Sequence, residues 1–203
     1  MDPAESLFAE IKNAGLMIEN SWNFMQNDLL DAKTNYIYRC QTVDQLEDNA
    51  QSLKLNRIEM FYAIHRWRNF KRHDAWLNLL VESVPLIKMS DQIYDKKADF
   101  IFLTPEGPVE FDLKVTRLSK KVSVEIPDQK LAAWLYSNQS RQSRYHLANR
   151  FFVVGHPEST LYDLELAQST INEFALTPKK FRFFIDHPNG EQSRAVVLRP
   201  KSV

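Results

Sequence analysis

Apolar residues in about the first 80 positions recur every three or four residues, which is the period of an amphipathic helix. No proline occurs between Pro3 and Pro85, so this stretch contains no residue that would break a helix outright. The pattern predicts helices over residues 4–14, 18–33, 42–52, 57–71 and 73–83. Thr42 and Gln45 have the spacing of a capping box at the start of the third helix. The last two ranges form either separate helices or one broken helix.

After Pro85 the hydrophobic pattern changes to that of β-strands. Apolar runs predict strands at 85–89, 98–103 and 109–116. In the third run the apolar residues alternate with a polar set that lies on the opposite face: Glu110, Asp112, Lys114 and Thr116. Between the second and third runs stands the sequence Thr-Pro-Glu-Gly-Pro, which has the composition and length of a hairpin turn. The two runs are therefore expected to pair as a β-hairpin.

The rest of the chain alternates helices with strands. An extended piece at 122–126 precedes a helix that opens at Pro127 and runs to about Asn149. The later elements are a buried strand at 151–155, a helix around 161–175, and strands at 181–185 and 194–199. We therefore expect a mixed α/β fold, in which helices flank a central mixed sheet and an all-helical extension precedes it.

The charges divide the chain more clearly than the hydrophobic pattern does. The sequence has 26 basic and 26 acidic residues, so its formal net charge is zero. Residues 1–53 carry a net charge of −6, residues 54–150 carry +6, and the remainder is neutral. We therefore predict an acidic helical extension over 1–53, packed on a core over 54–203 as one compact domain overall. The basic middle region permits local binding of a polyanion despite the overall neutrality.

Composition excludes several other classes of protein. The single cysteine, Cys40, cannot form an intramolecular disulfide, and no Cys/His cluster suggests a zinc finger. No run approaches the roughly 18 apolar residues that a membrane span needs. The four glycines are too scattered for a phosphate-binding loop. We expect a soluble cytoplasmic protein that does not bind membranes.

Two carboxylates stand out on the predicted hairpin. If Leu103 pairs with residue 108 or 109, Asp99 falls opposite residue 112 or 113, and the side chains of Asp99 and Asp112 can approach each other. Two such carboxylates repel unless a cation lies between them. A divalent metal would supply that charge, and hard oxygen ligands suit Mg²⁺, with Mn²⁺ as a substitute. The alternative is a surface hairpin with a cross-strand salt bridge between Lys114 and a carboxylate, which needs no metal.

Lys114 lies two residues beyond Asp112 on the same face of the strand. An ammonium group there can orient or activate a water and offset the charge that develops on a phosphate during phosphodiester hydrolysis. A metal beside it would lower the pKa of that water. The combination predicts metal-dependent phosphodiester cleavage.

Asp99, followed after 12 intervening residues by Asp112-Leu113-Lys114, resembles the signature of the PD-(D/E)XK nucleases. The order of predicted elements over about 56–155 is similar as well: a helix, three strands, a helix and a fourth strand. The resemblance implies a restriction-endonuclease-like core and a Mg²⁺-dependent DNA endonuclease. It also implies that Asp99, Asp112 and the Leu113 carbonyl bind metal and that Lys114 is the catalytic lysine. Lys97-Ala98 departs from the pattern, because many members have proline before the first aspartate.

The resemblance also suggests a glutamate on the preceding helix that reaches the metal, for which Glu59 is the candidate. Asn56 and Glu59 equally have the spacing of a capping box, so Glu59 is either catalytic or a helix cap, and Glu82 is its rival. Glu110 either binds a second metal or is solvated. Gln129 resembles a glutamine that some nucleases use to contact substrate or hold the lysine.

Bunched basic residues are the candidates for DNA contacts, since one helix that presents several arginines can neutralise several phosphates. The predicted DNA-binding residues are Arg66, Arg68, Lys71, Arg72, Arg117, Gln129, Arg141 and Arg144. A solvated helix face would have the same composition. Nucleases of this class often act as two copies, so a homodimer is expected. The alternative function is a nuclease-fold module that binds nucleic acid or protein with weak or no catalysis.

Overall fold

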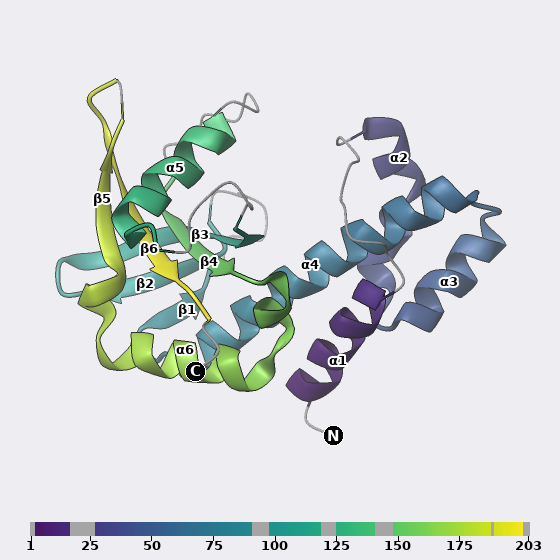
Figure 1. Ribbon diagram of the computed structural model, residues 1–203, viewed down its shortest axis with the longest axis horizontal. Helices are drawn as coiled ribbons and strands as arrows, with labels where there is room; N and C mark the ends of the chain where they lie inside the picture. The colour runs from purple at the N-terminus through teal and green to yellow at the C-terminus, as the bar shows by residue number, and fades with distance from the viewer. Residues whose placement is uncertain are drawn as a thin grey trace. The chain divides into compact units, whose positions relative to one another are not determined.

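Six α-helices and a six-stranded sheet make up the part of the chain that the computed structural model describes (Figure 1). The described residues are 3–16, 27–90, 98–118, 125–140, 148–187 and 189–200. The chain divides into two compact units, Met1–Ala75 and Trp76–Val203. None of the helices in the described ranges is long and apolar enough to cross a membrane.

The first unit is helical, as the sequence predicts. Its elements are α1 (Pro3–Leu16), α2 (Asp28–Lys33), a 3-10 helix (Asn35–Arg39), α3 (Val43–Ser52) and the first part of α4 (Arg57–Ser83). Ile37, Leu46 and Trp67 are buried in its core, and the indole N–H of Trp67 donates to the Cys40 carbonyl at 2.9 Å. The predicted cap of α3 is confirmed, because the Thr42 hydroxyl accepts the amide of Gln45.

Helix α4 runs without a break over residues 57–83, whereas the sequence pattern predicts two helices or one broken helix. It belongs to both units, since the division falls between Ala75 and Trp76, whereas the change of charge places the predicted boundary at residue 53. The reason is packing. Ala63, Ile64 and Trp67 of α4 join the core that the N-terminal helices build. The predicted helix over 18–33 is described only from residue 27, and α2 begins at Asp28.

The second unit contains a mixed sheet with the strand order β1-β2-β3-β4-β6-β5. The strands are β1 (Ile87–Met89), β2 (Phe100–Thr104), β3 (Gly107–Arg117), β4 (Arg150–Gly155), β5 (Arg182–Asp186) and β6 (Gln192–Leu198). Strands β1, β2 and β3 are antiparallel, β4 is parallel to β3 and β6, and β5 is antiparallel to β6. The predicted mixed α/β class is therefore confirmed.

Helices α5 (Asp128–Ser140) and α6 (Leu164–Leu176) lie on opposite faces of this sheet (Figure 1). On the α6 face Phe174 packs against Phe102 and Phe151. On the other face, Leu131 and Leu135 of α5 share a core with residues of β4, β5 and β6. That core, as far as the described residues go, includes no residue of β2 or β3.

The alternation of β3 places its polar residues on the α5 face. Phe111 and Leu113 are buried, and Phe111 stacks with Phe100 of β2 in the aromatic core next to α6. Asp112 and Lys114 therefore point to the other face, beside the area that α5 covers. The fold thus leaves two charged side chains on a part of the sheet where the α5 core does not extend.

Candidate active site

The hairpin that carries the candidate residues has the predicted register. Leu103 pairs with Pro108 and Phe100 with Phe111, and Pro105 and Glu106 form the loop between the strands. Gly107, which follows them, has a φ of +120°, a conformation that favours glycine. The turn chemistry and the apolar alternation both act locally, which is why the sequence predicts the register correctly.

Asp99 directly precedes β2, and it hydrogen-bonds to β3 beyond the paired residues of the two strands. Its amide donates to the Phe111 carbonyl at 2.9 Å, and its carboxylate Oδ2 accepts the amide of Leu113 at 2.7 Å. The side chain thus supplies an acceptor to β3 just beyond the last paired residue of β2. Asp99 is thereby held beside the Asp112-Leu113 peptide, as the sequence motif requires.

Asp112 and Lys114 form an ion pair along the strand. The Lys114 ammonium Nζ lies 2.8 Å from Oδ1 of Asp112. The Lys114 side chain is 39% exposed and that of Asp112 is 20% exposed. The pair lies within β3, so it differs from the cross-strand salt bridge that the alternative interpretation envisaged.

Arg150, the first residue of β4, is the unexpected member of the site. It pairs in register with Asp112, and its guanidinium Nη1 contacts Oδ2 of that carboxylate. The Arg150 side chain is only 5% exposed. Burial lowers its pKa, and the negative charge of Asp99 opposes this shift. Arg150 therefore brings a cation to the acidic pair from the neighbouring strand.

The sequence itself indicates a role for Arg150, although this residue is not part of the motif formed by Asp99, Asp112 and Lys114. The residue stands directly before the apolar run Phe151 to Val154, all buried in β4. A charge at the entrance of a fully buried strand needs a partner on an adjacent strand. Which strand is adjacent depends on the β3–β4 pairing, and this pairing is a tertiary feature.

Asn149 holds the entrance of the three central strands together. Its carbonyl accepts the amide of Asp112 at 3.0 Å, and its side-chain amide donates to the Glu110 carbonyl at 3.0 Å. Its Oδ1 accepts the amide of Arg194 in β6 at 2.8 Å. These bonds tie β3, β4 and β6 together at the level of Asp112, so Asn149 stabilises the backbone that carries the site.

The charges of the site balance without any added ion. The carboxylates of Asp99 and Asp112 face two cations, Lys114 and Arg150, and both oxygens of Asp112 contact a cation. No cluster of three or more His, Cys, Asp or Glu side chains suited to a metal occurs in the described part of the chain. Two carboxylates and the backbone carbonyl of Leu113 are nevertheless hard oxygen donors of the type that Mg²⁺ prefers.

Glu59 occupies the capping box that the sequence offered as its alternative role. The Asn56 side chain accepts the amides of Ile58 and Glu59, and Oε2 of Glu59 accepts the amide of Asn56 at 3.0 Å. Oε1 of Glu59 pairs with Lys33 at 2.6 Å. These hydrogen bonds lower the pKa of the Glu59 carboxyl. Both oxygens are thus engaged within the first unit, and the contacts are those of a helix cap.

The other two glutamates of the prediction are exposed. Glu82 lies near the end of α4, and Glu110 lies on β3 two residues before Asp112. Glu110 is on the same face as Asp112 and contributes its backbone carbonyl to Asn149. Neither glutamate is brought into a contact that marks it as a ligand.

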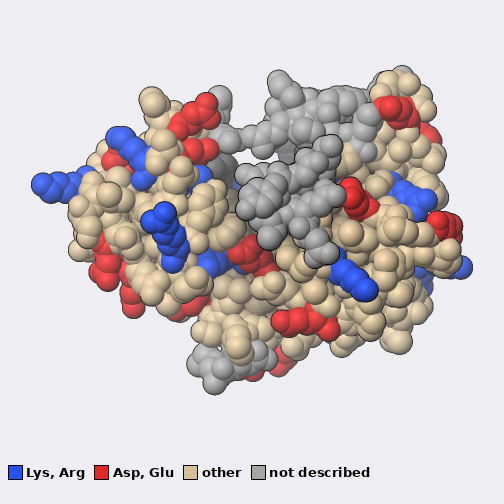
Figure 2. Space-filling model, turned by 180° about the vertical axis from the view of Figure 1, so that it is seen from behind, with Lys and Arg blue, Asp and Glu red and all other residues tan. Residues whose placement is uncertain are grey.

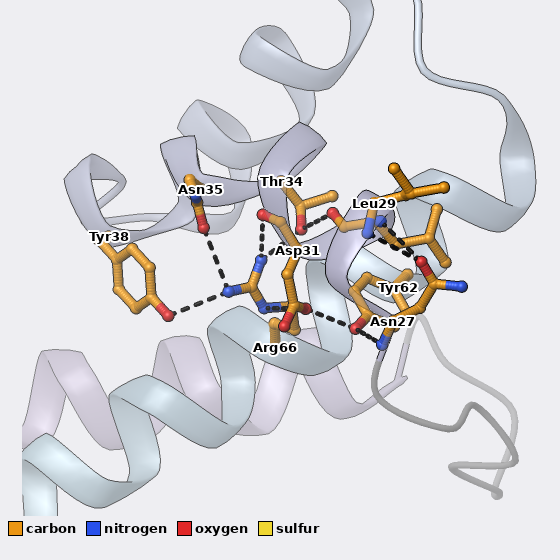
Figure 3. Close-up of polar contacts among 9 residues, drawn as sticks. Asn27, Leu29, Asp31, Thr34, Asn35, Tyr38, Tyr62 and Arg66 are labelled. Atoms are coloured by element: carbon orange, nitrogen blue, oxygen red, sulfur yellow. Dashed lines mark hydrogen bonds and ion pairs between the residues drawn. The ribbon is translucent and has the colours of Figure 1, made fainter.

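Arg66 is saturated by contacts within the first unit (Figure 3). Its Nε pairs with Asp31 at 3.2 Å, and Nη1 donates to the Asp31 carbonyl and the Thr34 hydroxyl. Nη2 donates to Asn35 and to the Tyr38 hydroxyl. These contacts use all five guanidinium N–H groups. Arg66 is thus engaged within the first unit, and its predicted role in DNA binding stays a prediction.

The rest of the predicted basic stripe on α4 does not form a solvent-facing row either. Lys71 and Arg72 are buried, and they donate to Gln41 and Asn69 respectively. Arg68 is half-buried. Arg68, Lys71 and Arg72 share one side of the helix and Arg66 lies on the other, since successive residues turn by about 100°. The basic run predicts an exposed stripe because composition does not record which faces pack.

Two of the remaining predicted DNA contacts are exposed in the second unit, namely Arg117 at the end of β3 and Gln129 in the first turn of α5. Arg141 and Arg144 lie outside the described residues. On the face that Figure 2 shows, basic and acidic side chains of the described residues are interspersed rather than gathered by sign. This face does not single out a surface for a polyanion.

Comparisons with protein-family models, with curated proteins and with solved structures found no match to this chain. The grounds for a function are therefore the sheet topology and the four charged residues Asp99, Asp112, Lys114 and Arg150, which lie where β3 begins to pair with β4.

Proposed function

We propose that the protein is a Mg²⁺-dependent DNA endonuclease whose reactive residues are Asp99, Asp112 and Lys114. The observation that carries this proposal is the meeting of the three motif residues at one place. Asp99 binds the Leu113 amide, and Lys114 lies 2.8 Å from Asp112. Residues so placed are available to one substrate group.

The topology supports the same proposal. In chain order the second unit contains the end of α4, the antiparallel strands β1, β2 and β3, then α5, and then β4 parallel to β3. The sequence resemblance to PD-(D/E)XK nucleases implies this order of elements. Because fold alone does not determine function, the proposal depends on the residues and uses the topology only as support.

Asp99, Asp112 and the Leu113 carbonyl are the groups that would hold a divalent ion. When bound, such an ion would lower the pKa of a water molecule and polarise a phosphate oxygen. Asp99 already accepts a hydrogen bond from the Leu113 amide, which keeps its carboxylate at the peptide that carries the third ligand. Lys114 and Arg150 contact Asp112 and offset its negative charge.

Lys114 is the residue of the site best placed to meet substrate. Its side chain is 39% exposed, whereas the Arg150 side chain is almost fully buried. Because the Lys114 side chain is the more exposed of the two cations, its ammonium can move from Asp112 to an incoming phosphate or water at a lower cost than Arg150. There it would donate a hydrogen bond where negative charge develops.

The direct test is incubation of the purified protein with supercoiled and linear DNA in Mg²⁺, Mn²⁺ or EDTA. We expect cleavage only with a divalent ion, and a loss of about 100-fold or more in the rate for Asp112→Asn and for Lys114→Met. Lys179→Met, which changes an exposed lysine of the second unit, is the matched control and should cut like wild type. Cleavage that persists in Asp112→Asn would contradict the proposal.

A second candidate is a nuclease-fold module that binds nucleic acid or protein without cutting. The observation in its favour is the balance of charge, since Arg150 and Lys114 neutralise the two carboxylates without a metal. This candidate predicts salt-dependent DNA binding in EDTA that Asp99→Asn leaves unchanged. A filter-binding or fluorescence titration of the wild type and this variant separates the two candidates.

A further inference from the structure

The two cations that contact Asp112 differ in their freedom to leave it. Lys114 contacts Oδ1 and is 39% exposed, whereas Arg150 contacts Oδ2 and is 5% exposed. A lysine ammonium on a flexible stem can move into water, where it is well solvated. A buried guanidinium that lost its carboxylate would remain as an uncompensated charge in the sheet, which is strongly unfavourable.

This difference assigns separate roles to the two oxygens of Asp112. An ion that binds Asp112 displaces the cation that is cheaper to move, so the oxygen that Lys114 contacts becomes available and the Arg150 contact stays. The backbone strengthens this asymmetry, because Arg150 and Asp112 are register partners in β4 and β3 and Asn149 ties the same two strands.

We propose that Arg150 is a positioning residue that holds one oxygen of Asp112 and thereby sets the affinity of the site for divalent ions. The inference rests on the proposed function for the identity of the ion. The fixed charge of Arg150 weakens the binding of a divalent ion. It also leaves the loaded site with one net positive charge from Asp99, Asp112, Arg150 and the ion, which favours a phosphodiester anion.

The test measures thermal unfolding of the full chain without DNA, in EDTA and over a series of Mg²⁺ concentrations. Arg150→Met keeps an unbranched, flexible apolar stem and removes the charge. We expect it to unfold at a lower temperature than wild type in EDTA and to be stabilised by Mg²⁺. The half-maximal stabilisation should occur at a Mg²⁺ concentration on the order of tenfold lower than in wild type, because one like charge beside a site commonly shifts its equilibria by such a factor.

Two control variants make the expectation specific. Lys114→Met also removes one positive charge that contacts Asp112, but this charge is more exposed than that of Arg150. Lys114→Met should therefore lower the half-maximal Mg²⁺ concentration less than Arg150→Met does. Arg150→Lys keeps the charge and should keep the wild-type Mg²⁺ concentration even where it loses stability. In Asp112→Asn/Arg150→Met the stabilisation by Mg²⁺ should disappear, because the ligand is gone.

The inference is overturned if Arg150→Met has the Mg²⁺ dependence of wild type. It is also overturned if Lys114→Met lowers the half-maximal Mg²⁺ concentration as much as Arg150→Met or more. If Arg150→Met is unfolded in EDTA, folding on addition of Mg²⁺ supports the inference, and failure to fold at saturating Mg²⁺ contradicts it. DNA cleavage is a separate readout. Wild-type protein that cuts DNA without the Arg150 shift overturns this inference alone, and the Arg150 shift without cleavage overturns the proposed nuclease alone.

Discussion

Two arginines, one in each unit, face an aspartate, and the rest of their surroundings differ. In the first unit Arg66 satisfies all its donors with Asp31 and with neutral acceptors of the N-terminal helices. In the second unit Arg150 contacts Asp112, and its Nε has no hydrogen-bond partner in the part of the chain that the structure describes. Asp112 also contacts a second cation, Lys114.

The difference teaches how to separate a structural arginine from one at a functional site. A saturated guanidinium stabilises the packing around it and has no donor left for a ligand. A buried guanidinium beside two carboxylates and a partly exposed lysine belongs to a charged cluster of the kind that gathers at functional sites. The sequence suggests the opposite assignment, since it predicts Arg66 as a DNA contact and does not single out Arg150.

The largest expected effect comes from breaking the saturated cluster. Arg66→Met should lower the free energy of unfolding of the first unit by about 4 kcal/mol, because it removes the ion pair with Asp31 and four further hydrogen bonds. Denaturant unfolding followed by circular dichroism measures this change. Equal stability of wild type and Arg66→Met would show that the cluster does not hold the first unit together.

Substitution of Asp112 in the second unit should affect both stability and DNA cleavage. Asp112→Asn leaves Arg150 buried without its carboxylate and should cost about 3 kcal/mol of stability. The DNA cleavage proposed above should fall in the same variant, whereas Asp31→Asn should cost stability and leave the cleavage rate per folded molecule unchanged. If Asp31→Asn and Asp112→Asn both lose DNA cleavage while fully folded, Asp31 and Asp112 do not differ in function as this comparison predicts.

A smaller effect distinguishes the two roles of Glu59. Glu59→Gln removes the ion pair with Lys33, so we expect a modest loss of stability at neutral pH and no loss of cleavage. The Glu59 carboxyl has a lowered pKa in the folded state, so its contribution is present above the unfolded pKa and is lost as the pH falls through the folded value. Melting curves of wild type and variant should therefore converge in acid. Loss of cleavage without loss of stability would restore the catalytic role.

The smallest effect concerns the buried basic residues of α4. Arg72→Met should change DNA affinity by less than about twofold and leave the salt dependence of binding unchanged, because a buried guanidinium releases no counterion from DNA. Arg117→Met, at an exposed position, is the comparison and should reduce the salt dependence if it contacts phosphate. A titration at two salt concentrations tests both variants.

The pattern of the sequence predicts most of the secondary structure because its signals are local. The helical period places α3, α4 and α6 near their observed bounds, and the alternation of β3 together with the turn at Pro105 predicts the hairpin register. The motif also brings Asp99 and Lys114 close to Asp112 for a local reason. Asp112 and Lys114 belong to strand β3 of the hairpin, and Asp99 directly precedes its other strand, β2. Apart from this register, the resemblance to a restriction-endonuclease-like core stays a prediction.

What the sequence determines by itself is therefore the set of charges on the hairpin, because turn chemistry and a two-residue period act over a few neighbouring positions. Only the tertiary structure decides which cation accompanies them. Arg150 follows Asp112 by a long crossover and meets it through the parallel pairing of β3 and β4. Long-range contacts likewise decide the roles of Arg66 and Glu59. Arg66 pairs with Asp31 and Glu59 pairs with Lys33, and both partners precede them by more than a helix. Burial and long-range pairing select partners that a basic run or a capping-box spacing leaves open.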